Sequence, residues 1–316
     1  MKYELPSSQK PLNIGTRGSP LALAQAYETR DRLGYAFDLP HDAFAIQVIT
    51  TTGDRIIDRP LKAIGGKGLF TREIEEMMLA GSIDIAVHSM KDMPTLQPEG
   101  LWLDTYLPRE DVRDAFISLN STTLADLAEG CVVGTSSLRR QAQLRLRRPD
   151  LKVVEFRGNL QTRLKKLEAK VADATFLAMA GLKRLKMHDV PRTAIEPEDM
   201  LPAVAQGAIG IERRIGDMRV AEMLEAINDG QTGQRLNAER AFLTALDGSC
   251  ETPIAGLAQL DGNSLRLRGE VLRPDGSDVV FDDVTVPIED GAEAGRVMAA
   301  KLLDSAGEGF FDWRTA

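Results

Sequence analysis

Apolar and polar positions along the first third of the chain predict strands that alternate with helices. An apolar strand ends at Ile14, and residues 21–33 then show the apolar spacing of a helix. A β-branched segment at 44–51 precedes a glycine-containing loop and a helix at 70–81, and a third apolar segment covers 83–90. This alternation predicts a mostly parallel sheet with both faces covered.

The same plan restarts near Val132. The segments IGTRGSPLALAQA and VVGTSSLRRQAQ both lead from an apolar strand through Gly-Thr and a small polar turn into a helix, with the Gly-Thr pairs 119 residues apart. A chance match is the alternative. We interpret the repeat as two α/β domains of similar build, each with a helix N-terminus whose free N–H groups favour anions. A charged segment at 108–116 separates the halves and is the candidate hinge.

The C-terminal part has a different pattern. Short β-patterned runs at 265–272 and 279–286 are accompanied by two Asp-Gly pairs, which are hairpin signals, and a helix at 292–307 follows. The predicted fold class is therefore α/β, with two doubly wound, hinged domains and a small α+β C-terminal domain that has an antiparallel sheet. The predicted domains are 1–107 with 208–226, 113–203, and 230–316.

Composition narrows the class of protein. With 316 residues, 43% apolar and 27% charged, the chain has the size and balance of a multidomain globular protein. No apolar run approaches the ~18–20 residues of a membrane span, and the first ten residues lack an apolar or Arg-rich targeting pattern. We expect a cytoplasmic protein without a membrane partner. Two cysteines and three scattered histidines favour neither a disulfide framework nor a metal site.

The net charge of −8 argues against nucleic acid as a partner, but the charges are segregated. Residues 139–170 carry eleven Lys or Arg against three Asp or Glu, whereas residues 247–316 carry six against fourteen. The functional interpretation of the basic segment is a binding site for an anionic small molecule. A solvated helix face is the alternative for some of its members, namely Arg145, Arg147, Arg148, Lys165 and Lys166.

One candidate for chemistry is HSMKDMP at 88–94, because ligands of open α/β sheets bind at the carboxyl ends of strands. Asp92, beside Lys91, is either a surface ion pair or a carboxylate that a cation-forming reaction needs. We expect His88 to be a packed strand residue. GGKGLF lacks the Ser or Thr of a P-loop, so Lys67 remains only a flexible cation.

GTSSLRR at 134–140 places two arginines in the first turn of a helix, where they oppose the helix dipole. Guanidinium groups bind carboxylates in a bidentate manner, so Arg139 and Arg140 indicate an anion site. EFRGNLQTRL contains a similar pair of arginines, Arg157 and Arg163. Phosphate binding would produce much the same pattern, so the motifs specify an anion and not its identity.

Cys250 follows a helix predicted at 238–246. The negative end of a helix dipole raises the pKa of a nearby thiol, whereas a turnover nucleophile needs a lowered one. A permanent attachment point therefore fits Cys250 better than a reactive thiol. An inert, half-buried cysteine is the alternative, and it is the interpretation we keep for Cys131.

In order and spacing, these motifs resemble the porphobilinogen deaminase (hydroxymethylbilane synthase) family over nearly the whole chain. They are TRGSPLALAQ, GGKGLF, DIAVHSMKDMP, GTSSLRRQ, FRGNLQTRL, LAMAGLKRL, LPAVAQGAIGIE and the cysteine loop. The family condenses four porphobilinogens into hydroxymethylbilane with loss of four ammonia molecules, in porphyrin and haem biosynthesis. The resemblance implies a monomeric transferase with a dipyrromethane cofactor on Cys250 through a thioether. It implies Asp92 as the catalytic carboxylate, which we expect in a water-poor site.

The resemblance also implies two sets of binding residues. The cofactor-binding set is Cys250, Arg17, Ser19, Lys91, Asp92, Thr135, Ser136, Ser137, Arg139, Arg140, Arg157, Gly158, Arg163, Arg184 and Gln206. The substrate-binding set is Arg17, Gln25, Lys67, Arg157, Arg163 and Arg184. These six arginines and two lysines are too few to pair every carboxylate of the completed chain, so we expect the growing chain to slide or the domains to shift.

The sequence departs from the family pattern at Ala63, where a lysine is common, and at Ala205, which replaces the first glycine of Gly-Gln-Gly. A non-enzymatic, hinged binding protein for a small polyanion, similar to periplasmic binding proteins, is one alternative function. A transferase that uses Cys250 as a transient nucleophile is another. A stable mass excess on Cys250 distinguishes the family activity from both.

Overall fold

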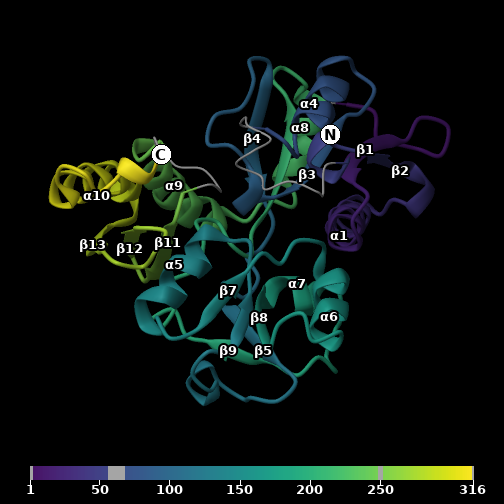
Figure 1. Cartoon of the computed structure of the whole chain (residues 1–316). Coiled ribbons are helices and arrows are strands. Elements are labelled where there is room, and N and C mark those ends of the chain that lie inside the picture. The colour runs from purple at the N-terminus through teal and green to yellow at the C-terminus, as the bar shows by residue number, and fades with distance from the viewer. Residues whose placement is uncertain (1–2, 56–67, 248–251, 315–316) are drawn as a thin grey trace. The chain divides into compact units, whose positions relative to one another are not determined.

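The computed structural model describes residues 3–55, 68–247 and 252–314. Its internal contacts divide the chain into two compact units. The first unit is Met1–Glu110 with Gly207–Gly233, and the second is Asp111–Gln206 with Gln234–Ala316. The first change of unit falls within the charged segment at 108–116. Figure 1 labels most of the helices and strands.

The first unit contains a five-stranded mixed sheet. Across the sheet its strands are β2 (Phe44–Ile49), β1 (Leu12–Arg17), β3 (Ile85–Ser89), β10 (Ile209–Arg214) and β4 (Leu101–Tyr106). β1 pairs in parallel with β2 and β3, as the sequence pattern predicts. β10 runs antiparallel to β3 and β4, because it enters the sheet when the chain returns from the second unit.

Helices cover both faces of this sheet. They are α1 (Pro20–Phe37), α2 (Thr52–Arg55), α4 (Arg72–Leu79) and α8 (Met218–Glu225), with 3-10 turns η1 (His41–Ala43) and η2 (Met90–Asp92). Ile85 and Val87 of β3 pack in the core cluster that contains α1 and α8 side chains. Ala86 packs with Ile74 and Met78 of α4 in a different cluster. Alternate residues of β3 therefore face opposite layers.

The second unit repeats this topology. Across its five-stranded sheet the strands are β7 (Lys152–Val154), β6 (Val132–Gly134), β8 (Ala174–Ala178), β5 (Asp114–Ser118) and β9 (Thr193–Ile195). β6 is parallel to β7 and β8, and β5 is antiparallel to β8 and β9. β6 thus takes the place of β1 and β5 that of β10, which confirms two α/β sheets of similar build.

The helices of this part follow its strands. They are η3 (Leu124–Asp126), α5 (Leu138–Arg147), α6 (Leu160–Glu168) and α7 (Met179–Arg184). Phe116, Phe176 and Leu144 form one core cluster, in which the two rings meet edge to face with centroids 6.3 Å apart. The side chain of Ser137 caps α5, so the helix begins immediately after the small polar turn, as the sequence predicts.

The second unit also contains the predicted antiparallel sheet, β11 (Ile254–Asp261), β12 (Ser264–Leu272) and β13 (Val279–Pro287). Gly262 and Gly276 have positive φ in its turns, in agreement with the hairpin signals. α10 (Gly291–Ala306) follows the 3-10 turn η4 (Ile288–Asp290), and η5 (Asp312–Arg314) comes last. The helix expected at 238–246 is longer: α9 covers Gly230–Ala245.

This small sheet packs between helices. The side chains of Phe242 from α9 and Met298 from α10 lie directly over Gly269 of β12, where an added Cβ would come within 2.6 Å of Met298 Sδ. On α5, Gln143 Nε2 donates to Glu270 Oε1 of β12 over 3.2 Å, and Arg145 Nη1 donates to the carbonyl of Pro274 over 3.0 Å. No helix in the described ranges is both long and apolar enough to cross a membrane.

Candidate active site

Asp92 lies where the sequence predicts it, at the carboxyl end of β3. It ends the single turn η2 and faces a cavity of about 80 Å³ within the first unit. The cavity is lined by Arg17, Ser19, Leu21, Ala22, Gln25, Phe70, Thr71, Val87, His88, Ser89, Asp92 and Met93. Four residues of the predicted site thus come together: Arg17, Ser19, Gln25 and Asp92.

One expectation for Asp92 is wrong. We expected a water-poor environment, but the side chain of Asp92 is exposed. The reason is local: Met90 and Met93 on either side are buried, and the turn η2 leaves Asp92 at the rim of the cavity.

Arg17, at the end of β1, is held by a carboxylate that the sequence analysis did not single out. Its Nε lies 3.2 Å from both carboxylate oxygens of Asp54, and its guanidinium lies 4.2 Å from the centroid of the Phe70 ring. Burial alone would raise the pKa of Asp54, but hydrogen bonds from Arg17 and Thr51 outweigh burial and lower that pKa. Arg17 is therefore a positioned cation at the cavity.

Ser19 and Gln25 have local partners in the same cavity. Ser19 is the N-cap of α1, and its Oγ accepts a hydrogen bond from the backbone N–H of Ala22 over 3.2 Å. Gln25, buried on α1, donates from Nε2 to Ser89 Oγ over 2.8 Å. Ser89 precedes η2 directly, so this bond ties the helix to the turn that carries Asp92.

The second unit gathers Arg139, Arg140 and Gln206 around one buried carboxylate, Asp114 of β5. Arg139 Nη2 and Arg140 Nη2 each donate to Asp114 over 2.7 Å, and Gln206 Nε2 donates over 2.9 Å. Both arginines are at most 5% exposed and Asp114 is fully buried. Burial opposes the ionised form of Asp114, yet the charges of the two arginines hold its pKa well below the ordinary value.

The charges of this cluster do not balance. Two guanidiniums face one carboxylate, and Arg139 Nε is buried without a hydrogen-bond partner in the described part of the chain. Glu270 accepts a hydrogen bond from Gln143 and interacts electrostatically with Arg139, and burial raises the pKa of the Glu270 carboxyl group. At Asp114 itself two guanidiniums face a single carboxylate, an arrangement that suits a further carboxylate.

The hydroxyl groups of GTSSLRR shape the turn before α5. Thr135 Oγ1 accepts from the N–H of Ser137 over 3.2 Å, and Ser136 Oγ accepts from the N–H of Phe156 over 2.9 Å. Ser137 Oγ caps the helix at the N–H of Arg140. These contacts fix the turn that leads into Arg139 and Arg140.

A second basic turn precedes α6. Arg163 Nε donates to the carbonyl of Gly158 over 2.9 Å, and Gly158 has φ of +118°. A Cβ at Gly158 would lie 2.6 Å from Thr162 Cγ2, so only glycine fits this turn. Arg157 and Arg163 are half-buried, as is Arg184 at the end of α7.

Several predicted residues need separate mention. Lys91 lies in η2 beside Asp92 and is half-buried. Lys67, Cys250 and the departure at Ala63 lie outside the described residues. Ala205 does adopt the backbone conformation that a glycine would favour, with φ of 60°. In the described part of the chain no group of three or more His, Cys, Asp or Glu could hold a metal ion.

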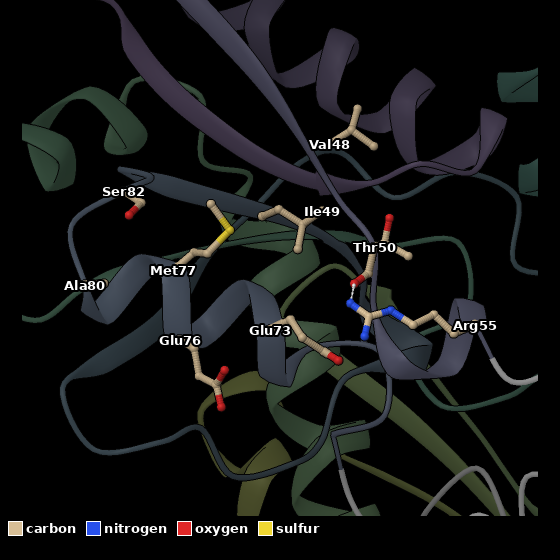
Figure 2. A pocket seen from close by; sticks show the side chains of 9 residues that line it. All are labelled: Val48, Ile49, Thr50, Arg55, Glu73, Glu76, Met77, Ala80 and Ser82. Carbon is tan, nitrogen blue, oxygen red and sulfur yellow. Dashed lines mark hydrogen bonds between the residues drawn. The ribbon is translucent and has the colours of Figure 1, made fainter.

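A larger depression of about 500 Å³ lies between β2 and α4 (Figure 2). Its lining mixes apolar side chains such as Ile49 and Met77 with the carboxylates of Glu73 and Glu76. Arg55 Nη2, on its edge, donates to the carbonyl of Thr50 over 3.2 Å. None of the predicted site residues lines this depression, so the smaller Asp92 cavity is the candidate active site.

Sequence reasoning missed three acidic partners, the half-buried Asp54 and the buried Asp114 and Glu212. Asp114 lies in the charged segment at 108–116, which we interpreted only as a hinge. The sequence feature that could have identified it is a single acidic residue within an apolar strand pattern. A charged side chain that is buried in a strand needs a partner of opposite charge.

Comparison with known proteins identifies the family of this chain. A family model described as "Porphobilinogen deaminase, dipyromethane cofactor binding domain" matches residues 12–222, and one described as "Porphobilinogen deaminase, C-terminal domain" matches residues 234–304. The porphobilinogen deaminase of Paracoccus denitrificans is 65% identical over 310 residues, covering 98% of this chain and 99% of the relative. That of Nitrobacter hamburgensis is 53% identical, covering 94% of each.

Solved structures give weaker likenesses. Lipoprotein Tp32 of Treponema pallidum aligns with a TM-score of 0.44 at 13% identity, covering 70% of this chain and 92% of that one. A periplasmic binding protein of Salmonella typhimurium aligns with a TM-score of 0.40 at 13% identity, covering 70% and 93%. Because both family models and the high-identity relatives span nearly the whole sequence, the chain belongs to the porphobilinogen deaminase family.

Proposed function

We propose that this chain condenses four porphobilinogen molecules head to tail, with release of four ammonia molecules and, after hydrolysis, of hydroxymethylbilane. The family match over 98% of the chain carries this proposal. Two features of the structure support it: a carboxylate at the carboxyl end of β3, and buried arginines with excess positive charge. Porphobilinogen carries an acetate and a propionate, which need cations, and an aminomethyl group, which needs a carboxylate.

The described residues fit the dipyrromethane cofactor of the family. Arg139 and Arg140 share a single carboxylate, and Arg139 Nε has no hydrogen-bond partner among the described residues, so both arginines suit one of its carboxylates. Arg157 and Arg163, which flank the turn at Gly158, would supply guanidinium groups for another. When bound, the cofactor supplies the pyrrole to which the first porphobilinogen is joined. The further residues proposed to hold it are Ser19, Lys91, Thr135, Ser136, Ser137, Arg184 and Gln206, with Cys250 as the covalent attachment through a thioether.

The residues around the Asp92 cavity would handle the substrate. Asp92 would stabilise the positive charge that develops on the pyrrole as ammonia leaves and would hold the pyrrole N–H groups. Arg17, already oriented by Asp54, would bind a substrate carboxylate. Gln25 would keep the turn η2 in place through Ser89.

Intact-mass spectrometry of the purified chain, combined with ammonia release from porphobilinogen, tests the proposal. We expect a stable mass excess equal to two substituted pyrroles, which Cys250→Ser removes together with activity, while Cys131→Ser keeps both. An unmodified chain that releases ammonia, or an unmodified chain that only binds polycarboxylates, would contradict the proposal. We also propose a cytoplasmic monomer, to be tested by cell fractionation and sedimentation.

A further inference from the structure

Three buried titratable side chains from three elements interact behind the Asp92 cavity. His88 of β3 places Nε2 3.1 Å from Glu212 Oε2 of β10, with the two side chains 5% and 0% exposed. Glu75 of α4 is 8% exposed and interacts electrostatically with both. Neither the predicted site nor the proposed function uses any of these groups.

The register of the sheet brings the pair together. β3 and β10 are antiparallel, with His88 opposite Gly210 and Ala86 opposite Glu212. His88 and Glu212 are therefore diagonal neighbours on one face, within reach of long side chains. Ala86 belongs to the core cluster of α4, so this is the face that α4 covers. The pair is thus fixed by backbone pairing and not by a mobile loop.

The carboxyl groups of Glu75 and Glu212 interact electrostatically. Burial raises the pKa of Glu75, and the nearby Glu212 raises it further. An ionised carboxylate only accepts hydrogen bonds, so a hydrogen on Nε2 of His88 satisfies the 3.1 Å contact with Glu212 Oε2. Nδ1 is then the nitrogen that can take up or release a proton.

The carboxylate of Glu212 also has spare capacity. Its Oε1 is buried and has no hydrogen-bond partner among the residues that the structure describes. A proton on Nδ1 would create an imidazolium beside this under-used carboxylate, which favours the charged pair. The titratable or charged groups that face His88 are Glu212 from β10, Glu75 from α4, Asp92 from η2 and, across the cavity, Arg17 from β1.

The proposed reaction needs such a group. In each condensation the C–N bond of the aminomethyl group breaks and its electron pair leaves with ammonia. A C–C bond then forms to the α-carbon of the acceptor pyrrole, and the C–H bond at that carbon breaks. Its electron pair returns to the ring and one proton is released. The substrate enters as an ammonium, so ammonia departs without consuming that proton.

We propose that His88, oriented by Glu212, accepts the proton that each condensation releases into the Asp92 cavity. Asp92 remains the carboxylate that stabilises the developing charge, and Glu212 is a positioning residue. The inference rests on the proposed function, because it assigns a step of that reaction, and on His88 lining the same cavity as Asp92.

Histidine NMR on the full-length protein tests the proposal without turnover, since the chain has only three histidines. We expect the His88 signal, assigned as the one lost in His88→Gln, to show a hydrogen on Nε2 and none on Nδ1. Glu212→Gln, which preserves size but removes the negative charge, should weaken this preference for one tautomer. A hydrogen fixed on Nδ1 in the wild-type protein overturns the proposal, because Nδ1 could not then accept a proton.

Kinetics provides the second readout. We expect His88→Gln to lower kcat at least ~30-fold, as for loss of a proton acceptor, with KM and the intact mass unchanged. In Glu212→Gln, which removes the charge that orients His88, the pH profile of kcat should change, whereas a purely structural role of Glu212 would leave its shape unchanged. His41→Gln is the matched control, since His41 Nε2 lies 3.4 Å from Asp31 in an exposed pair.

The outcomes separate the two proposals. Wild-type protein that does not release ammonia from porphobilinogen contradicts the proposed function itself. If the wild-type protein is active and folded His88→Gln has a kcat within twofold of the wild-type value, only the role of His88 is overturned. If His88→Gln does not fold, as shown by thermal unfolding, Glu212→Gln decides: an unchanged pH profile overturns the proposal.

Discussion

Arg139 Nη2 lies 2.7 Å from Oδ2 of Asp114, and protein atoms enclose the pair almost completely. The sequence analysis assigns Arg139 to a bound anionic ligand, but in the structure Arg139 already pairs with the carboxylate of Asp114. Arg140 shares the same carboxylate, so Asp114 orients both guanidiniums while neutralising only one of them. Orientation before binding reduces the cost of ordering long side chains when a ligand arrives.

Asp114→Asn should therefore be strongly destabilising. It leaves two buried guanidiniums without a counter-charge, and breaking a buried pair costs about 3–5 kcal/mol. The folded-state pKa of Asp114 is depressed, so its contribution is fully present above the unfolded pKa of about 3.9. The loss, measured by urea unfolding, should be constant between pH 5 and 8.

Asp283→Asn is the control for this measurement. Asp283 accepts from Arg266 Nε over 2.9 Å in an exposed pair, and such pairs contribute about 0–1 kcal/mol. Equal losses in the two variants would show that Asp114 has no special role in holding the arginines.

Asp111 predicts a pH dependence of stability. Burial raises its pKa, but hydrogen bonds from Arg113 and Lys183 outweigh burial and lower the pKa to about 2. Its contribution, roughly 2 kcal/mol, is present above the unfolded pKa of about 3.9 and is lost as pH falls through about 2. The stability advantage of wild type over Asp111→Asn should thus be about halved at pH 3 relative to pH 6. Asp304→Asn, on an exposed position of α10, should show no such change.

Local patterns predicted the elements that position the site, but not the partners of its charges. Strand ends and caps are local, so Asp92 after β3 and Ser137 at the start of α5 were predictable. Asp54, Asp114 and Glu212 reach their partners across 25 to 124 residues of sequence, through tertiary contacts that no local pattern encodes. The antiparallel strands β5 and β10 depend on the chain crossing between units for the same reason.

Ala205→Gly should stabilise the protein. Ala205 has φ of 60°, a conformation that costs a non-glycine residue about 1–2 kcal/mol, while its N–H donates to Glu239 Oε2 over 2.7 Å. Glycine removes this strain but adds about 0.5–1 kcal/mol of chain entropy, so the net gain should be about 0.5–1 kcal/mol. Ala203→Gly, without the positive φ, should instead lower the free energy of unfolding.

Gly158→Ala should disrupt the turn before α6. Both the φ of +118° and the 2.6 Å approach to Thr162 Cγ2 oppose a side chain there. Gly81→Ala is matched in having a positive φ of 74°, but no atom lies within 4 Å of its Cβ. Gly158→Ala should therefore lose more stability than Gly81→Ala. It should also lose the proposed cofactor mass, because Arg163 is anchored on the carbonyl of Gly158. Equal behaviour of the two variants would remove Gly158 from the site.

Asp92→Asn should separate chemistry from folding. The side chain of Asp92 is exposed at the cavity rim, so its replacement should change the free energy of unfolding by no more than about 0.5 kcal/mol. Asparagine keeps the hydrogen-bonding shape but not the negative charge that stabilises the developing cation. Ammonia release should fall at least ~100-fold, as when a charge-stabilising group is removed, while the intact mass shows the cofactor retained. Glu99→Gln, an exposed acid on a nearby loop, should leave the rate unchanged. If Asp92→Asn released ammonia within threefold of the wild-type rate, a group other than Asp92 would stabilise the cation.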